Sequence, residues 1–145
     1  MQLTFPVHAD GLTLTVLVGL NHQEATTLVQ AGQPVPAPLW KTAVIDTGSN
    51  VTCVSGATLQ QLGVSGTGQG STQTASGALA VRLFQVSLGI PLFGNPPGSL
   101  LLNRQLTVME LLSAIPNVDV LIGLDILLTG RLLLDGPVKQ FTLEF

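Results

Sequence analysis

The sequence has few charged side chains, one cysteine and no long uninterrupted apolar segment. Only 9% of the 145 residues are charged, and Lys and Arg together number five. With a net charge of −3 and no basic run, the chain lacks the positive surface that nucleic-acid binding requires. The most apolar region, residues 121–134, is interrupted by two glycines and two charged residues. We therefore expect neither a nucleic-acid partner nor a membrane span.

Cysteine and histidine are too scarce for a disulfide framework or a usual metal site. Cys53 has no second cysteine to pair with, and the two histidines lie far from it in sequence. A single free cysteine is typical of a reducing compartment, and the first residues lack the basic and apolar segments of a secretory signal. We expect a cytoplasmic protein without a metal or another cofactor.

Apolar residues, by contrast, are abundant. They make up 46% of the chain, which is more than the core of one small domain needs. The length of 145 residues corresponds to one domain, residues 1–145. The surplus of apolar side chains predicts a subunit interface or a lined groove.

Short strand-like segments separated by turn residues predict an all-β domain with one or two short helices. Strand character is found at residues 12–20, 40–45, 51–54, 71–74, 79–88, 118–122, 132–134 and 141–145. The apolar segments 100–102 and 106–111 fit helix or strand, and we favour strand. Ser55 is a suitable N-cap for a short helix that Gly63 would end. Asp10-Gly11 predicts a hairpin that joins residues 3–7 to 12–20. Residues 21–38 contain three prolines and predict a surface loop, with a short strand at residues 26–29 as an addition to it.

One loop stands out for its chemistry. Ala43-Val44-Ile45 predicts a buried strand that breaks at Asp46-Thr47-Gly48-Ser49-Asn50. A carboxylate beside apolar neighbours is costly unless another group shares its charge, its proton or its hydrogen bonds. Asp46 is therefore the first candidate for a catalytic residue.

The Asp46 loop resembles the active-site loop of aspartic proteases, and two further segments extend the resemblance to the retroviral-type (retropepsin-like) family. Residues 118–127, with Ile122-Gly123-Leu124-Asp125, are similar to the second-half segment of its cellular and bacterial branch. Thr74-Ala75-Ser76-Gly77 lies where that family has a glycine-rich hairpin flap. The resemblance covers residues 12–145. It implies a small closed β-barrel that forms a homodimer.

The same resemblance assigns roles to individual residues. Asp46 would be catalytic, and Gly48 would supply it with a backbone donor. Thr47 would bond across the dimer axis, and Ser49 could donate to the outer oxygen of the carboxylate. Residues 74–77 would cover the substrate, and Ile122 and Gly123 would lie near the active site.

The chain contains one Asp-Thr-Gly, whereas peptide hydrolysis by this chemistry needs two carboxylates around one water. A homodimer would supply the second Asp46. The implied function is an aspartic endopeptidase, with a peptide or protein as substrate.

Other interpretations of these residues stay open at this point. The same fold could serve as a non-catalytic dimerisation or peptide-binding module, and Asp46 could be an ordinary turn acid. Cys53 could be a nucleophile with His8 or His22, although a buried small side chain is the simpler interpretation. We interpret Asp125 as a structural acid at a helix start.

Overall fold

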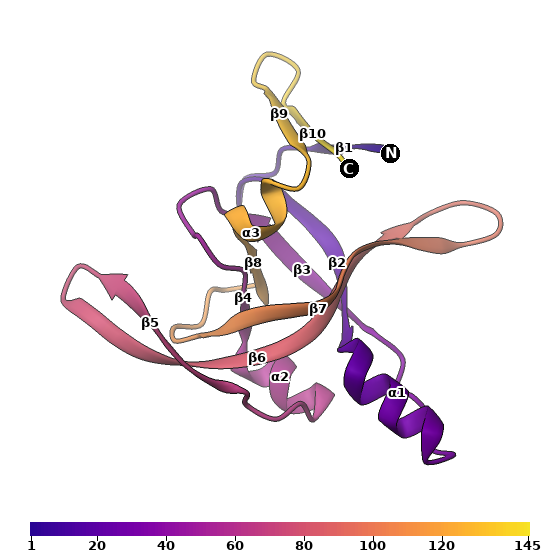
Figure 1. Cartoon of the computed structure of the whole chain (residues 1–145). Coiled ribbons are helices and arrows are strands. Elements are labelled where there is room, and N and C mark those ends of the chain that lie inside the picture. The colour runs from indigo at the N-terminus through magenta and orange to yellow at the C-terminus, as the bar shows by residue number, and fades with distance from the viewer.

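Six strands close into a barrel in the computed structural model, which describes residues 1–145. Their order is β2 (Thr13–Leu20), β3 (Leu39–Ile45), β8 (Val120–Ile122), β4 (Cys53–Ser55), β7 (Gly98–Leu111) and β6 (Gly77–Leu92). The barrel closes because β6 also pairs with β2. A further strand, β5 (Gly68–Thr74), pairs only with β6 (Figure 1). The predicted small closed all-β barrel is confirmed.

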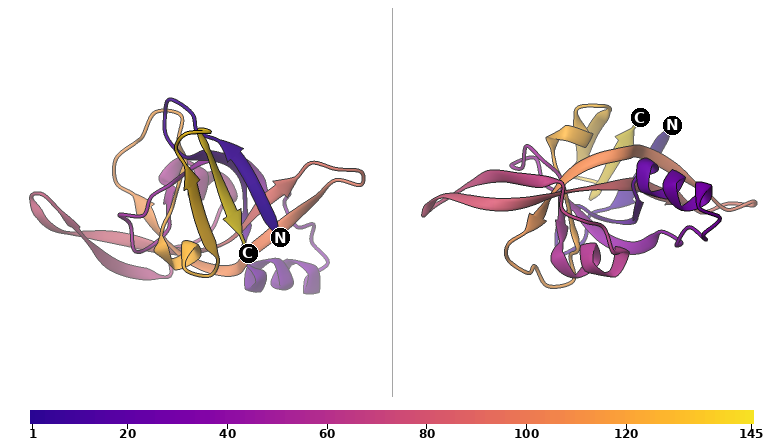
Figure 2. Two further views of the ribbon diagram at one scale, coloured as in Figure 1. Left: turned by 90° about the horizontal axis from the view of Figure 1, so that it is seen from above. Right: turned by 60° about the horizontal axis from the view of Figure 1, so that its bottom comes forward.

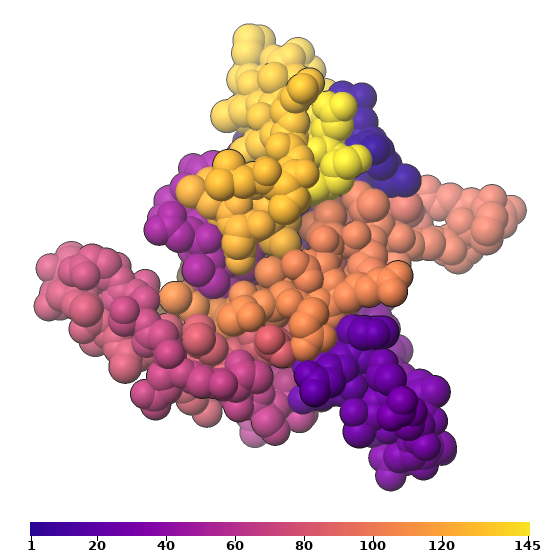
Figure 3. Space-filling model, viewed as in Figure 1, coloured from indigo at the N-terminus to yellow at the C-terminus, as the bar shows by residue number.

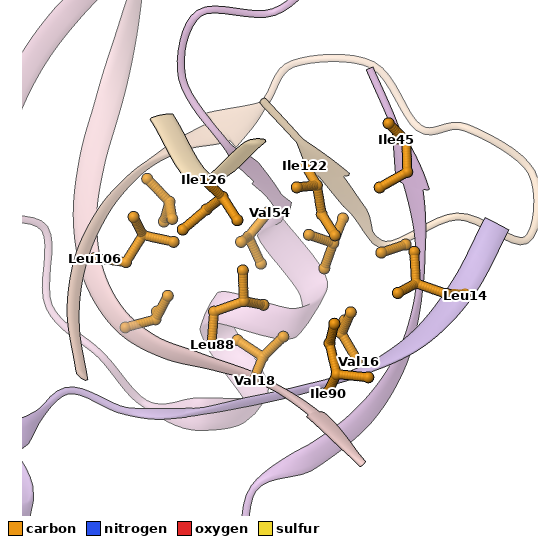
Figure 4. Close-up of a cluster of buried hydrophobic side chains, with 14 of the residues drawn as sticks. Leu14, Val16, Val18, Ile45, Val54, Leu88, Ile90, Leu106, Ile122 and Ile126 are labelled. Carbon is orange, nitrogen blue, oxygen red and sulfur yellow. The ribbon is translucent and has the colours of Figure 1, made fainter. Parts of the chain in front are cut away.

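The core of the barrel is aliphatic. Side chains of alternate residues point inward, as the two-residue period of a strand requires. Leu14, Val16 and Val18 of β2 show this period, and all three are buried. They meet inward-facing side chains of β4, β6, β7 and β8 (Figure 4). This packing holds the ends of β3 and β8, where the candidate site lies, in fixed positions.

The two chain ends form a second, smaller sheet. Its order is β1 (Gln2–Pro6), β10 (Gln140–Glu144) and β9 (Arg131–Asp135), and all pairs are antiparallel. The strands predicted at residues 132–134 and 141–145 are thus β9 and β10, which form a hairpin. The predicted hairpin of β1 with β2 is wrong. The Asp10-Gly11 turn makes only one bridge, between His8 and Gly11, because β1 leaves β2 to pair with β10.

Three short helices accompany the strands. The second, α2 (Gly56–Leu62), begins at the N-cap Ser55 and ends at Gly63 in the left-handed conformation, as predicted. The third is α3 (Leu124–Leu127). None of the helices has the length and apolar character that a membrane crossing needs.

The first helix, α1 (His22–Gln30), lies in the segment that we predicted as a loop, so that prediction is wrong for these residues. The N-cap residue of α1, Asn21, is buried, and its side chain makes two hydrogen bonds. Its Oδ1 accepts from the backbone N–H of Glu24 at 2.9 Å, and its Nδ2 donates to the carbonyl of Gln85 on β6 at 3.0 Å. The three prolines follow the helix instead of preventing it.

Two hairpins extend away from the barrel in opposite directions (Figure 2). One is formed by β5 and the first part of β6, and the other by the end of β6 and the start of β7. The space-filling view shows both as protrusions, with the β9–β10 hairpin standing apart from them (Figure 3). The predicted hairpin with its turn at Ala75-Ser76 is the first of the two.

Candidate active site

Asp46 follows the last residue of β3 and is half-buried. Its backbone N–H donates to the carbonyl of Ile122 at 3.0 Å, so β8 fixes its position. Its Oδ1 accepts from the backbone N–H of Gly48 at 3.0 Å, and its carbonyl accepts from the N–H of Ser49 at 3.2 Å. The tight turn therefore holds one carboxylate oxygen and leaves Oδ2 without a hydrogen bond within the chain.

Gly48 supplies the backbone donor that the family resemblance implied. A Cβ at this position would lie 3.2 Å from Asp46 Oδ1, closer than most side chains tolerate. Thr47 is exposed, and its hydroxyl makes no hydrogen bond within the chain. The role of Thr47 across a dimer axis stays a prediction.

Ser49 does not donate to Asp46. Its hydroxyl donates to the carbonyl of Val51, two residues further along, at 2.7 Å. A hydroxyl has one proton, and the short loop places the nearest acceptor inside the loop itself. The predicted donation from Ser49 to the carboxylate is therefore wrong for this structure, and Ser49 instead braces the turn.

A second acid, Asp125, holds the loop after β3 in place through Thr52. Asp125 Oδ1 accepts from the hydroxyl of Thr52 at 2.7 Å, and Oδ2 accepts from the backbone N–H of Thr52 at 2.9 Å. The Thr52 hydroxyl in turn accepts from the N–H of Gly123 at 3.1 Å. Since Thr52 is fully buried, this network satisfies polar groups that water cannot reach. Asp125 is structural, as we interpreted it, although sequence reasoning missed its partner Thr52.

Gly123 allows the segment after β8 to contact the loop after β3. A Cβ there would lie 2.8 Å from the carbonyl oxygen of Ser49 and 2.8 Å from the carbonyl carbon of Val51, which a folded protein does not accommodate. Just beyond it, the N–H of Leu124 donates to the carbonyl of Ser49 at 2.8 Å. The prediction that places Ile122 and Gly123 beside the Asp46 loop agrees with this geometry.

A cavity of about 540 Å³ lies beside Asp46. Part of the lining is the polar strand β5, from Ser71 to Thr74, and seven further lining residues are apolar. The apolar lining comprises Val51, Cys53, Val81, Met109, Leu111, Leu112 and Leu121. Sequence reasoning had singled out only Cys53 among these, because the barrel closure that joins them is not visible in sequence spacing.

The four predicted flap residues do not all line the cavity. Thr74 lines the cavity, whereas Ala75, Ser76 and Gly77 form the tip of the hairpin outside the lining. The Thr74 hydroxyl donates to the carbonyl of Gly77 at 2.8 Å and closes the turn. The hairpin thus borders the Asp46 cavity, and the strand before its tip makes the contact.

Cys53 is a poor candidate for a nucleophile. Burial raises the pKa of its thiol, the nearby Ser49 hydroxyl opposes this effect, and the charges of Asp125 and Asp46 reinforce it. A raised pKa leaves little thiolate at neutral pH. The thiol donates weakly to the carbonyl of Val51 at 3.5 Å, and neither histidine makes a hydrogen bond to it. No group of three His, Cys, Asp or Glu side chains is placed to hold a metal ion.

Comparisons with known proteins bear on the fold. No protein-family profile and no curated protein sequence matches the chain. Among solved structures, it is similar to a retropepsin-like aspartic protease from Rickettsia conorii, with a TM-score of 0.60 and 14% sequence identity. The match covers 100% of this chain and 91% of that one. The chain therefore has the fold of a retropepsin-like aspartic protease.

Proposed function

We propose that the protein is an aspartic endopeptidase in which two copies of the chain each contribute Asp46 to one dyad. The observation that carries the proposal is the position of Asp46. Its carboxylate has one oxygen held by Gly48 and the other free, and it borders a cavity large enough for peptide side chains. The shared fold with a retropepsin-like aspartic protease supports the same chemistry.

The second acid has to come from another chain. Glu110 is the one other acid that lines the cavity, and Arg82 binds it through Nε at 2.8 Å and Nη2 at 2.6 Å. Asp125 is bound on both oxygens by Thr52. No acid of the same chain is therefore free to share a proton with Asp46, which is the reason for proposing a homodimer.

The reaction would use the two Asp46 carboxyls in different protonation states. The ionised carboxyl takes a proton from the bound water, which attacks the scissile carbonyl, while the protonated partner donates to the carbonyl oxygen. The Gly48 N–H orients the carboxyl. Only the singly protonated pair is competent, so the rate is expected to pass through a maximum as pH varies.

The cavity walls favour an extended peptide with apolar side chains. β5 pairs with β6 on one edge only, so the backbone groups of its other edge are available for strand addition. The lining also includes apolar residues such as Val81, Met109 and Leu121. The test is incubation with a peptide library at several pH values beside Asp46→Asn, with cleavage products identified by mass spectrometry. Equal cleavage by both proteins, or none by either, would refute the proposal.

The role of the hairpin as a lid can be tested at its tip. Gly77 has a φ of +115°, and a Cβ there would meet no atom within 4 Å. Gly77→Val therefore strains the turn without a clash, at a cost of about 1–3 kcal/mol. We expect kcat/KM to fall about tenfold, while the melting temperature falls by several degrees and the protein stays folded.

Gly68→Val is the matched control for that variant. Gly68 lies on the same hairpin, has space for a Cβ and lacks a positive φ. It is expected to keep wild-type turnover. Wild-type kinetics of Gly77→Val would mean that the hairpin tip takes no part in turnover.

A further inference from the structure

We propose that an exposed apolar surface beside the β6–β7 hairpin, the Trp40 patch, docks the protein on the surface of a lipid bilayer. The patch consists of Leu17 of β2, Trp40 of β3, Leu101 of β7 and Phe93, which follows β6. Its occupant would be the boundary between the headgroups and the acyl chains of zwitterionic lipids. This docking does not depend on the proposed peptidase activity.

The strand register builds the patch. Trp40 is the register partner of Leu17, Leu17 that of Gly89, and Gly89 that of Leu101, so one row of residues crosses β3, β2, β6 and β7. Both chain neighbours of Leu17 are fully buried in the core, so the Leu17 side chain and its row face outward. Gly89, in the middle of the row, has no side chain and is itself buried by its surroundings. The row therefore forms one continuous apolar strip on the outside of the barrel.

Two aromatic side chains dominate this strip. Phe93 is 84% exposed and Trp40 is 60% exposed, and their ring centroids lie 6.1 Å apart. Leu101 is 44% exposed. Exposed apolar side chains that are scattered singly need no explanation, whereas a contiguous patch marks an interaction site. The contact between the two rings makes this patch contiguous.

The patch lies in parts of the chain that carry no charge. Residues 11–21, 25–40 and 83–103 contain no Asp, Glu, Lys or Arg. Lys41, the residue after Trp40, directs its ammonium to the side chain of Gln61 on α2, at 3.2 Å. A surface without charge loses no ion hydration when it enters a lipid interface, and it gains no attraction to anionic lipids. Zwitterionic lipid is therefore the occupant that its electrostatics fit.

The shape of the patch favours a bilayer over a peptide ligand. Phe93 begins the turn of the β6–β7 hairpin, which projects from the barrel (Figures 2 and 3). A projecting tip can enter a flat lipid surface, whereas a short peptide is usually held in a groove. Aromatic side chains are favoured at the headgroup level of membranes. Pro96 and Pro97 in the same turn have no backbone N–H that would lose its hydration.

Docking at this tip would be shallow and reversible. Irregular backbone is unstable in the hydrocarbon region, so the side chains alone would reach the acyl boundary. With so few apolar side chains, we expect half-saturation at roughly 0.1–1 mM lipid. The β5–β6 hairpin, which borders the Asp46 cavity, extends in the opposite direction (Figure 2). The cavity would therefore stay open to the surrounding water.

Trp40 itself supplies the measurement, because it is the only tryptophan and the chain has no tyrosine. Phosphatidylcholine vesicles are added to the full chain, and the emission spectrum is recorded against lipid concentration. We expect the emission to move to shorter wavelength as the indole leaves water. Phe93→Ser should raise the lipid concentration of the half-maximal shift about tenfold, and Leu101→Ser should raise it less. Circular dichroism checks that both variants are folded.

Val138→Ser is the matched control, because Val138 is 58% exposed in the turn between β9 and β10. It should bind vesicles as the wild type does. Phosphatidylserine in the vesicles should not strengthen binding, since the chain has a net charge of −3. No shift at about 10 mM lipid, a shift that Phe93→Ser leaves unchanged, or binding that needs phosphatidylserine would overturn the proposal. A shift with a proline-rich peptide and none with vesicles would also overturn it, and would assign the patch to a protein partner.

Discussion

Asp46→Asn is expected to lower kcat/KM for peptide cleavage by about 10²–10⁴-fold or more, because general acid–base catalysis contributes that much and the change removes it from both halves of the dyad. Asparagine keeps the size of the side chain and an oxygen that can accept from the Gly48 N–H. It also removes the repulsion between two neighbouring carboxylates, so the stability of the dimer should hold or rise. The measurement is steady-state kinetics on a peptide selected from the library.

Asp10→Asn is the matched control, since Asp10 is an exposed acid in the turn before β2. It should cleave at the wild-type rate. If Asp46→Asn did so too, Asp46 would not be catalytic. If the wild type bound peptides without cleaving them, the chain would be a peptide-binding module on this fold instead of an enzyme.

Asp125→Ala is expected to lower the free energy of unfolding by about 2–4 kcal/mol, the largest stability effect that we predict for an acid. The change removes both acceptors of Thr52, whose N–H and hydroxyl are inaccessible to water. A buried donor without an acceptor costs far more than an exposed one. Chemical denaturation monitored by circular dichroism gives the value.

Asp119→Ala provides the comparison for Asp125→Ala. The Asp119 carboxylate accepts one long hydrogen bond, from the hydroxyl of Ser55 at 3.4 Å. Its removal should lower the free energy of unfolding by well under 1 kcal/mol. A loss at Asp125 no larger than at Asp119 would mean that the Thr52 network does not hold the Asp46 loop in place.

The sequence predicted most strands correctly because their two-residue apolar period is a local property. The error at β1 arose because contacts between residues distant in sequence determine which strands pair. Asp10-Gly11 is a genuine turn signal, yet Leu3 and Phe5 of β1 pair with Leu143 and Phe141 of β10, and the Phe5 and Phe141 rings stack at 5.2 Å. Burying those aromatic side chains outweighs a local hairpin.

The missed helix α1 did carry a signal. Asn21 followed three residues later by Glu24 is a recognised start pattern for a helix, and the observed N-cap bond joins these two residues. Three later prolines made the whole segment look irregular. A proline disrupts a helix only near its own position. The nine residues of α1 precede all three prolines, so they can form a helix.

The part of the candidate site whose residues lie close together in sequence could be predicted. Asp46 and Gly48 belong to one turn, and their bond follows from that turn. Thr52 and Asp125 are 73 positions apart, and no local pattern joins them. The apolar lining of the cavity likewise gathers residues from several strands, so only the closed barrel reveals it.

The central claim, that one active site takes Asp46 from each of two chains, is tested most directly by mixing wild type with Asp46→Asn at constant total concentration. After exchange of subunits, a mixture of equal parts should have about one quarter of the wild-type activity, because only a quarter of the dimers carry both carboxyls. Activity should follow the square of the wild-type fraction. A linear dependence, with half the activity at equal parts, would contradict the shared dyad.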